Sequence, residues 1–318
     1  ETGAGQWGSS LAFAGQMFGI DIEVFMVKVS FDQKPYRKLM MQSFGAKCHP
    51  SPSSLTDFGK KLLDDNPNNP GSLGIAISDA IESVVKSWGK AKYSLGSVLG
   101  HVLMHQTING NEAILQMEQA GDYPDIIVGC TGGGSNLSGL MFPFLGQQLR
   151  GGQKIDIIGC EPLSCPSFTK GKYAYDHGDM AKMTPLIKMH TLGSDFLPPA
   201  NHSGGLRYHG MSYHLSHLYN LGLMRAKAYG QKECFEAGVT FGNQEGIIPA
   251  PEANHAVKGA MDAALDCKEK GESKTILFNL CGHGHFDMTA YSDYFDNKLA
   301  DNVFVEEIVS KALANLPN

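Results

Sequence analysis

Short apolar runs alternate with stretches of helical periodicity along most of the chain. Runs rich in β-branched and aromatic residues predict strands at residues 23–29, 46–49, 124–130, 155–160 and 275–281. Between them, apolar positions at helical spacing predict helices at residues 35–44, 74–88, 137–149 and from Pro251 to near Gly271. Strands that alternate with helices indicate the α/β class, with a mostly parallel sheet covered by helices on both faces.

Two segments do not follow this alternation. Residues 64–72 contain the run Asn-Pro-Asn-Asn-Pro-Gly, which predicts a surface loop. Residues 164–210 are rich in Gly, Pro, His and Tyr and only weakly periodic, which is typical of functional or mobile segments. Near residue 105 the apolar pattern passes from one set of strands and helices to a second. We therefore expect two domains, at residues 1–104 and 105–318.

The amino-acid composition excludes several classes of protein and partner. A chain of 318 residues with 42% hydrophobic residues can form two substantial cores. It has 26 basic and 32 acidic residues, a net charge of −6, and no basic run, which argues against nucleic acid and anionic membrane as partners. The apolar runs are of strand length, so we expect no membrane span. The seven cysteines lack the paired spacings of zinc or disulfide frameworks, which favours reduced thiols and a cytoplasmic protein.

A glycine-rich loop follows the strand predicted at residues 124–130. Its sequence is Thr131-Gly132-Gly133-Gly134-Ser135-Asn136, and a predicted helix comes next. Glycines let backbone N–H groups converge on an anion, and the helix adds its positive N-terminal end. The Walker and dinucleotide-binding spacings are both absent. The loop thus predicts a phosphate site at residues 132–136, although a tight turn without a ligand also explains the run.

A second loop of this kind stands at the start of the chain. Residues Thr2-Gly3-Ala4-Gly5-Gln6 precede a helical pattern, so they offer backbone donors suited to a substrate carboxylate. Glu1 beside this loop could exchange a proton with a substrate hydroxyl, provided that burial raises its pKa. The alternative is an exposed acid without a role.

Other candidate residues lie near the C-terminus. Cys281 follows the last predicted strand, at the edge of the sheet where ligands of α/β proteins bind, and its thiol could hydrogen-bond a ring nitrogen. Glu245 could lie under an aromatic ring as a positioned carboxylate, whereas Glu252 is explained by favourable charge at a helix start. Cys281, His283 and His285 alternate on one turn and suit a tetrahedral metal poorly, and the histidines at 202–217 are better explained as surface or core residues, so we expect no metal.

Several segments, in one order over nearly the whole chain, together resemble the tryptophan synthase β chains, and more narrowly their second subfamily. The segments that carry the resemblance are ETGAGQWG at 1–8, QKPYRKLM at 33–40, GSLGIAISDAIE at 71–82, GCTGGGSN at 129–136, GGLRYHG at 204–210, EGIIPAPEANHA at 245–256 and NLCGHGHFD at 279–287.

The resemblance implies a pyridoxal-phosphate-dependent lyase of fold type II, with two domains and parallel sheets covered by helices. It implies a β-replacement in tryptophan biosynthesis, in which L-serine and indole give L-tryptophan and water. It further implies a homodimer and a part of residues 6–88 that closes over the substrate and responds to an α subunit, although the residues do not show whether this chain pairs with an α subunit. A monovalent cation near the carbonyls of Gly132 and Tyr208 is compatible with it.

The resemblance also assigns residues to roles. The loop at 132–136 would hold the cofactor phosphate, residues 2–6 the serine carboxylate, and Glu1 would be the acid–base group. The cofactor ring would be bordered by Glu245, Cys281, Gly205, Gly96 and Ser97. Cys281 replaces the usual serine at the ring nitrogen, a weaker but still neutral hydrogen-bond partner. Trp7 replaces a histidine of the main subfamily, and Arg207 replaces an acid that contacts the serine hydroxyl, which leaves substrate handling there open.

One family feature has no match in this sequence. In the family, the lysine that forms a Schiff base with the cofactor lies in a His-Lys pair upstream of the leading glutamate. We therefore expect the sequence to be an N-terminally truncated fragment, with an incomplete first domain and inactive on its own. Two alternatives stay open: another β-eliminating enzyme of this fold, such as a serine dehydratase or threonine synthase relative, and a noncatalytic protein that binds the cofactor or a partner subunit.

Overall fold

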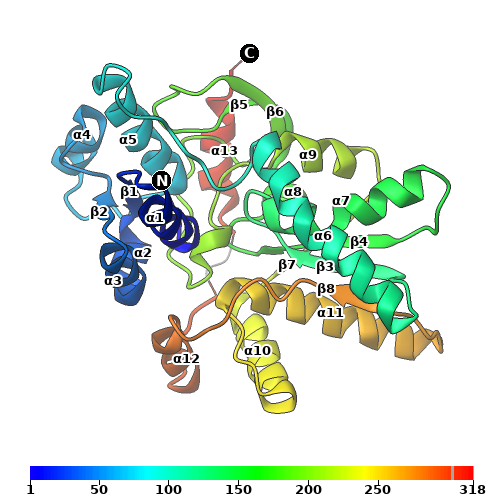
Figure 1. Ribbon diagram of the computed structural model, residues 1–318. Coiled ribbons are helices and arrows are strands. Elements are labelled where there is room, and N and C mark those ends of the chain that lie inside the picture. Colours follow the sequence, from blue (N-terminus) through cyan, green and yellow to red (C-terminus); the bar gives the residue numbers. More distant parts are fainter. Residues whose placement is uncertain (302–303, 318) are drawn as a thin grey trace.

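A four-stranded parallel sheet forms the centre of the larger part of the molecule (Figure 1). The computed structural model describes residues 1–301 and 304–317. The strand order is β7-β4-β3-β8, with bounds β3 (Ile126–Cys130), β4 (Asp156–Pro162), β7 (Arg225–Tyr229) and β8 (Ile276–Phe278). Because all these strands run in the same direction, their carboxyl ends lie at one edge, where ligands of open α/β sheets bind.

Helices cover both faces of this sheet (Figure 1). Ile127 packs with side chains of α6, α7 and α9 on one face, and Val128 packs with side chains of α10 and α11 on the other. Successive side chains of a strand point to opposite faces, so these two neighbours belong to different clusters. The predicted parallel α/β sheet is confirmed. The bounds are α6 (Gly100–Ala120), α7 (Ser135–Leu149), α9 (Tyr213–Asn220), α10 (Gln231–Glu245) and α11 (Pro251–Lys270).

A smaller parallel pair of strands organises the N-terminal third, drawn in blue in Figure 1. Val24 and Met26 of this pair pack against Ala12 and Met41 from two of the flanking helices. Thr2 forms an isolated parallel bridge with Met26, which fixes the first residues beside this sheet. The bounds are β1 (Glu23–Val27), β2 (Lys47–Ser51), α1 (Gln6–Phe18), α2 (Lys28–Gln33), α3 (Pro35–Ser43), α4 (Asp57–Asp65) and α5 (Leu73–Lys86).

The weakly periodic segment at residues 164–210 forms an antiparallel hairpin flanked by short helices. The Asp179 carboxylate accepts a hydrogen bond from Ser78 of α5 at 2.8 Å and further bonds from the hairpin turn, so this segment is tied to the N-terminal helices. The remaining elements are β5 (Lys172–His177), β6 (Leu186–Thr191), α8 (Ser167–Lys170), η1 (Gly204–Leu206), α12 (Met288–Phe295) and α13 (Glu306–Ala314).

Most predicted elements are present, with small shifts at their ends. Gly45 and Gly271 follow α3 and α11 with positive φ, as expected of helix-ending glycines. The strand predicted at 275–281 is too long, because β8 ends at Phe278 where the chain leaves the ladder. The predicted domain boundary after residue 104 falls inside α6, and the division stays a prediction. None of the described helices is both long and apolar enough to cross a membrane.

Candidate active site

A cavity of about 650 Å³ opens at the carboxyl ends of the central strands, beside the first residues of the chain. This volume is in the usual range for small-molecule sites. Of the residues predicted for the site, Gly5 and Glu245 do not line it. The lining includes the others: Glu1, Thr2, Gly3, Ala4, Gln6, Gly96, Ser97, Gly132, Gly133, Gly134, Ser135, Asn136, Gly205 and Cys281.

The glycine loop after β3 is closely packed on its outer side. A Cβ atom on Gly132 would lie 2.4 Å from the carbonyl oxygen of Gly205, and one on Gly133 would lie 2.7 Å from Val98. Gly134 is the N-cap of α7 and has φ +96°. The backbone N–H groups of Gly132, Gly133 and Gly134 donate no hydrogen bond to another described residue. With the N-terminus of α7, they form a set of free donors suited to a phosphate.

The loop at residues 2–6 has the same form at the start of α1. Gly5 is the N-cap, with φ +98°, and its N–H donates to the Thr2 hydroxyl at 3.1 Å. The N–H groups of Gly3 and Ala4 donate to no other described residue. This loop therefore offers fewer free donors than the loop after β3, and their number suits a carboxylate.

Glu1 is buried at the wall of the cavity, next to this loop. The Tyr93 hydroxyl donates a hydrogen bond to Glu1 Oε2 at 2.6 Å. Burial raises the pKa of the Glu1 carboxyl above its ordinary value, although the bond from Tyr93 acts in the opposite direction. A carboxyl with a raised pKa can both hold and release a proton near neutral pH. No pattern in the sequence singled out Tyr93, which lies in an irregular segment.

The structure brings Glu252, rather than Glu245, to the cavity. Glu245 is exposed at the last position of α10 and does not line the cavity. Glu252 lies in the first turn of α11, is 4% exposed, and accepts a hydrogen bond from Gly205 N–H at 2.8 Å on Oε1. An acid in a first helical turn is also favoured by the helix dipole, which is why the sequence pattern did not single it out.

Two thiols lie close to each other, one at the end of β3 and one three residues beyond the end of the neighbouring β8. Cys281 lines the cavity, and its Sγ lies 3.5 Å from Sγ of Cys130, the last residue of β3. The bond with Cys281, and then burial, raise the pKa of the Cys130 thiol well above its usual value. The Cys130 thiol is therefore a neutral group near pH 7. Within the described residues, no group of three or more His, Cys, Asp or Glu side chains could hold a metal ion.

Trp7 and Arg207, the two departures from the main subfamily, lie in different places. Trp7 lines the cavity, and a Cβ atom on Gly96 would lie 2.2 Å from its indole ring, so only glycine fits there. Arg207 does not line the cavity, and instead donates to the Ser30 hydroxyl at 2.6 Å. Burial lowers the pKa of Arg207 to about 10.

The polar atoms of the cavity fit pyridoxal phosphate. Trp7 Nε1 and Glu252 Oε2 are buried without a hydrogen-bond partner among the described residues, one a donor and the other an acceptor. Buried polar atoms are nearly always paired, so a ligand with a polar acceptor and a polar donor would suit these two residues of the cavity wall. The free donors of the loop after β3 would take the phosphate, and the remaining polar atoms surround space for a ring.

Comparisons with known proteins agree with this chemistry. The family model described as "Pyridoxal-phosphate dependent enzyme" matches residues 1–282. "Tryptophan synthase beta chain 2" of Aquifex aeolicus is 56% identical over 304 residues, which cover 95% of this chain and 70% of the relative. The protein of the same name from Thermotoga maritima is 55% identical over 291 residues, 92% of this chain and 68% of the relative.

The chain belongs to the tryptophan synthase β chain family. This tryptophan synthase β chain homologue is accordingly an enzyme that depends on pyridoxal phosphate. Among solved structures, a threonine deaminase from T.th. has a TM-score of 0.59 and 15% identity, covering 87% of this chain and 74% of that chain. This structural similarity confirms the α/β fold that the sequence predicts for the β chain homologue.

Proposed function

We propose that the protein catalyses the β-replacement in which L-serine and indole yield L-tryptophan and water. The observation that carries this proposal is a buried acid, Glu1, beside the loop at residues 2–6 and in the same cavity as the glycine loop after β3. The family named after this product supports the reaction.

The proposed cofactor site lies at the sheet end of the cavity. Residues 132–136 would bind the phosphate, and Gly96, Ser97 and Gly205 would border the ring, since all of them line this space. Cys281 is the proposed partner of the ring nitrogen and Glu252 the carboxylate beside the ring. Bound pyridoxal phosphate supplies an electron sink for the amino acid. The protein supplies orientation and a defined charge environment.

The loop at residues 2–6 would bind the serine carboxylate, which places the substrate next to Glu1. Because Tyr93 O–H occupies Glu1 Oε2, the other oxygen, Oε1, is the one available to the substrate. Glu1 Oε1–H would give its proton to the serine hydroxyl, which leaves as water. The resulting carboxylate would then accept the proton that indole loses when it forms the new carbon–carbon bond. The proton on Glu1 is thus restored after each cycle.

An assay of the enzyme expressed from its complete gene tests this proposal. With serine and indole, tryptophan should form, and the variant Glu1→Gln should lose about 100-fold or more in kcat while the cofactor absorbance is retained. Glu118→Gln, an exposed acid on α6, is the matched control and should behave like the wild type. Release of pyruvate without tryptophan would contradict the synthase reaction and favour an eliminating enzyme. Wild-type turnover in Glu1→Gln would contradict the role of Glu1.

The names of the relatives also bear on the binding partners. The relatives are named as β chains of a synthase, which supports association with a chain of a second kind. The homodimer, the monovalent cation, the cytoplasmic location and closure of residues 6–88 over the substrate stay predictions.

A further inference from the structure

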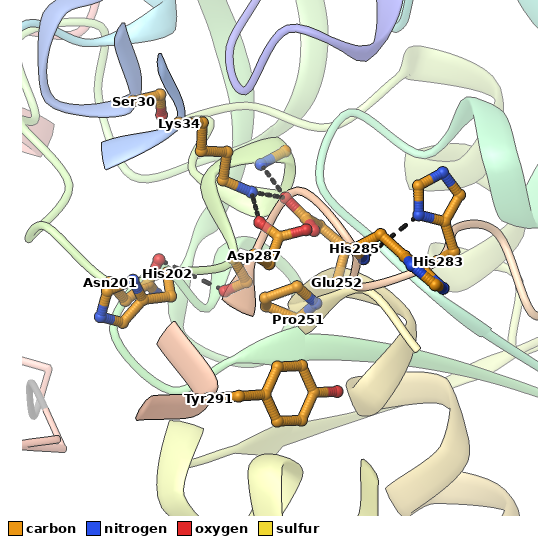
Figure 2. A network of polar contacts seen from close by, with 12 residues as sticks. Ser30, Lys34, Asn201, His202, Pro251, Glu252, His283, His285, Asp287 and Tyr291 are labelled. Atoms are coloured by element: carbon orange, nitrogen blue, oxygen red, sulfur yellow. Dashed lines mark hydrogen bonds and ion pairs between the residues drawn. The ribbon is translucent and has the colours of Figure 1, made fainter. Parts of the chain in front are cut away.

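A buried lysine connects the N-terminal third of the chain to the wall of the cavity (Figure 2). Lys34 is 3% exposed, and its Nζ lies 2.5 Å from Asp287 Oδ1 and 3.5 Å from Glu252 Oε1. Asp287 directly precedes α12, and Glu252 belongs to the first turn of α11. These ion pairs therefore join residues that are far apart in the sequence.

The local sequence explains why Lys34 points inward. Pro35 is the first residue of α3, and a proline disfavours the helical conformation of the residue before it. Lys34 accordingly adopts φ −124° and ψ 63° between α2 and α3 instead of continuing a helix. Burying an ammonium group is costly unless it is paired. Its two carboxylate partners satisfy this requirement.

Glu252 is the member of this cluster that lines the cavity. Its Oε1 receives the Gly205 N–H and faces the Lys34 ammonium group, whereas its Oε2 is buried without a partner among the described residues. Burial alone would raise the pKa of Glu252, but Lys34, the Gly205 N–H and Arg37 outweigh burial and hold the pKa below its ordinary value. The pKa of Asp287 is instead raised, because burial outweighs its contact with Lys34.

We propose that Lys34 is a positioning residue for Glu252: its ammonium group, anchored by Asp287, holds the Glu252 carboxylate beside the cofactor site as an anion. This inference rests on the cofactor placement proposed above. A fixed negative charge next to the ring influences the electron distribution of the cofactor, a property that the protein controls through groups near the ring.

Few other groups can replace Lys34 in this role. Among the described residues, Lys34 is the only side-chain cation within ion-pair distance of Glu252. Other titratable groups on the surrounding elements interact electrostatically with Glu252. They are Arg37, Arg207, His202, His255, Cys130 and Tyr291. Of these, Arg37 helps to stabilise the carboxylate but ranks behind Lys34. Loss of Lys34 should therefore leave Glu252 dominated by burial, and the carboxyl should take up a proton at higher pH.

The absorbance of the bound cofactor as a function of pH tests this inference on the holoenzyme expressed from its complete gene. Protonation of Glu252 beside the ring should change the cofactor absorbance. In Lys34→Met, the midpoint of this absorbance change should move upward by about one to three pH units, because Glu252 takes up its proton at higher pH. Lys34→Arg should restore most of the wild-type profile, because a cation remains. Lys28→Met is the matched control: Lys28 lies on the adjoining α2, is partly exposed and pairs with Asp32, so its loss should leave the profile unchanged.

A second variant separates positioning from folding. Lys34→Met/Asp287→Asn removes one positive and one negative charge, so the buried cluster keeps its charge balance while Glu252 still loses its lysine. It should shift the profile in the same direction as Lys34→Met but by less, because the Asp287 carboxylate, whose negative charge acts against the Glu252 anion, is removed as well. If both variants lower the melting temperature but keep the wild-type profile, Lys34 is only structural and the inference is overturned. A wild-type enzyme that binds the cofactor but makes no tryptophan would instead refute the proposed reaction, since the absorbance comparison does not depend on turnover.

Discussion

The loop at residues 2–6 and the glycine loop after β3 have nearly the same local structure. Gly5 has φ 98° and ψ −3°, Gly134 has φ 96° and ψ −3°, and each is the N-cap of a helix. Four residues later, Ser9 and Ser138 each donate a hydroxyl hydrogen bond of 2.7 Å to the carbonyl of the N-cap glycine. A threonine stands three positions before both glycines. The chain thus uses one backbone arrangement twice.

The surroundings of the two loops make them different. Val98 and Ser97 approach Gly133 so closely that no side chain fits, whereas Ala4 keeps a buried methyl group at the matching position. The Thr2 hydroxyl accepts the N–H of Gly5, whereas the Thr131 hydroxyl donates to a carbonyl of β4. The loop after β3 therefore keeps more N–H groups free. One local conformation thus leaves different numbers of N–H groups free, because its neighbours decide how many of them are bonded.

Among variants of the two loops, the largest effect should come from crowding the loop after β3. In Gly132→Ala, the new methyl group would meet the backbone oxygen of Gly205 at 2.4 Å, and neither backbone can yield easily. Overpacking of this kind costs about 1–3 kcal/mol, which corresponds to roughly a 10–100-fold loss of pyridoxal phosphate affinity. Titration of the enzyme with the cofactor, followed by absorbance, measures this change.

Gly146→Ala, in the helix that follows this loop, is the matched control. Its methyl group would meet only the mobile end of Arg150 at 3.4 Å, so it should bind the cofactor normally. Unfolding should show it unchanged or stabilised by about 0.5–1 kcal/mol, because alanine is favoured over glycine inside helices. Equal loss of affinity in both variants would mean that general disturbance of α7, and not the loop contact, controls cofactor binding.

Intermediate effects should separate the two loops by ligand. Gly5→Ala and Gly134→Ala both force alanine into positive φ, at about 1–2 kcal/mol each. Gly134→Ala should weaken cofactor binding by about tenfold, whereas Gly5→Ala should raise the KM for serine by a similar factor and leave cofactor affinity unchanged. Steady-state kinetics and cofactor titration of both variants test this division. A rise in serine KM confined to Gly134→Ala would reverse the proposed assignment of the loops.

The smallest effect should come from the two serines that support the loops. Ser9→Ala and Ser138→Ala each remove one buried hydrogen bond, but the glycine carbonyls keep the helical N–H of the same serines, at 2.9 and 3.0 Å. Each variant should lose about 0.5–1.5 kcal/mol of unfolding free energy. If the two loops are equivalent, the two losses should be similar. Denaturant unfolding measures both, and a clearly larger loss in one variant would show that its surroundings depend more on that serine.

The local features of the chain could be predicted because they depend on neighbouring residues. The strands of the central sheet, the helix ends at Gly45 and Gly271 and both glycine loops follow from periodicity and backbone freedom. Glu252 could not be distinguished from Glu245, because the sequence does not show which acid faces the cavity. Tyr93 and Lys34 were not recognised as partners of cavity residues, since their contacts join distant segments.

The sequence by itself determined the fold class, the two loops and the family, because apolar periodicity, glycine and a long run of shared motifs are properties of order along the chain. Only the tertiary structure decided which groups share the cavity. Burial and pairing depend on neighbours brought together by packing: burial raises the pKa of Glu1 against the bond from Tyr93, whereas the charges and donors around Glu252 lower its pKa against burial.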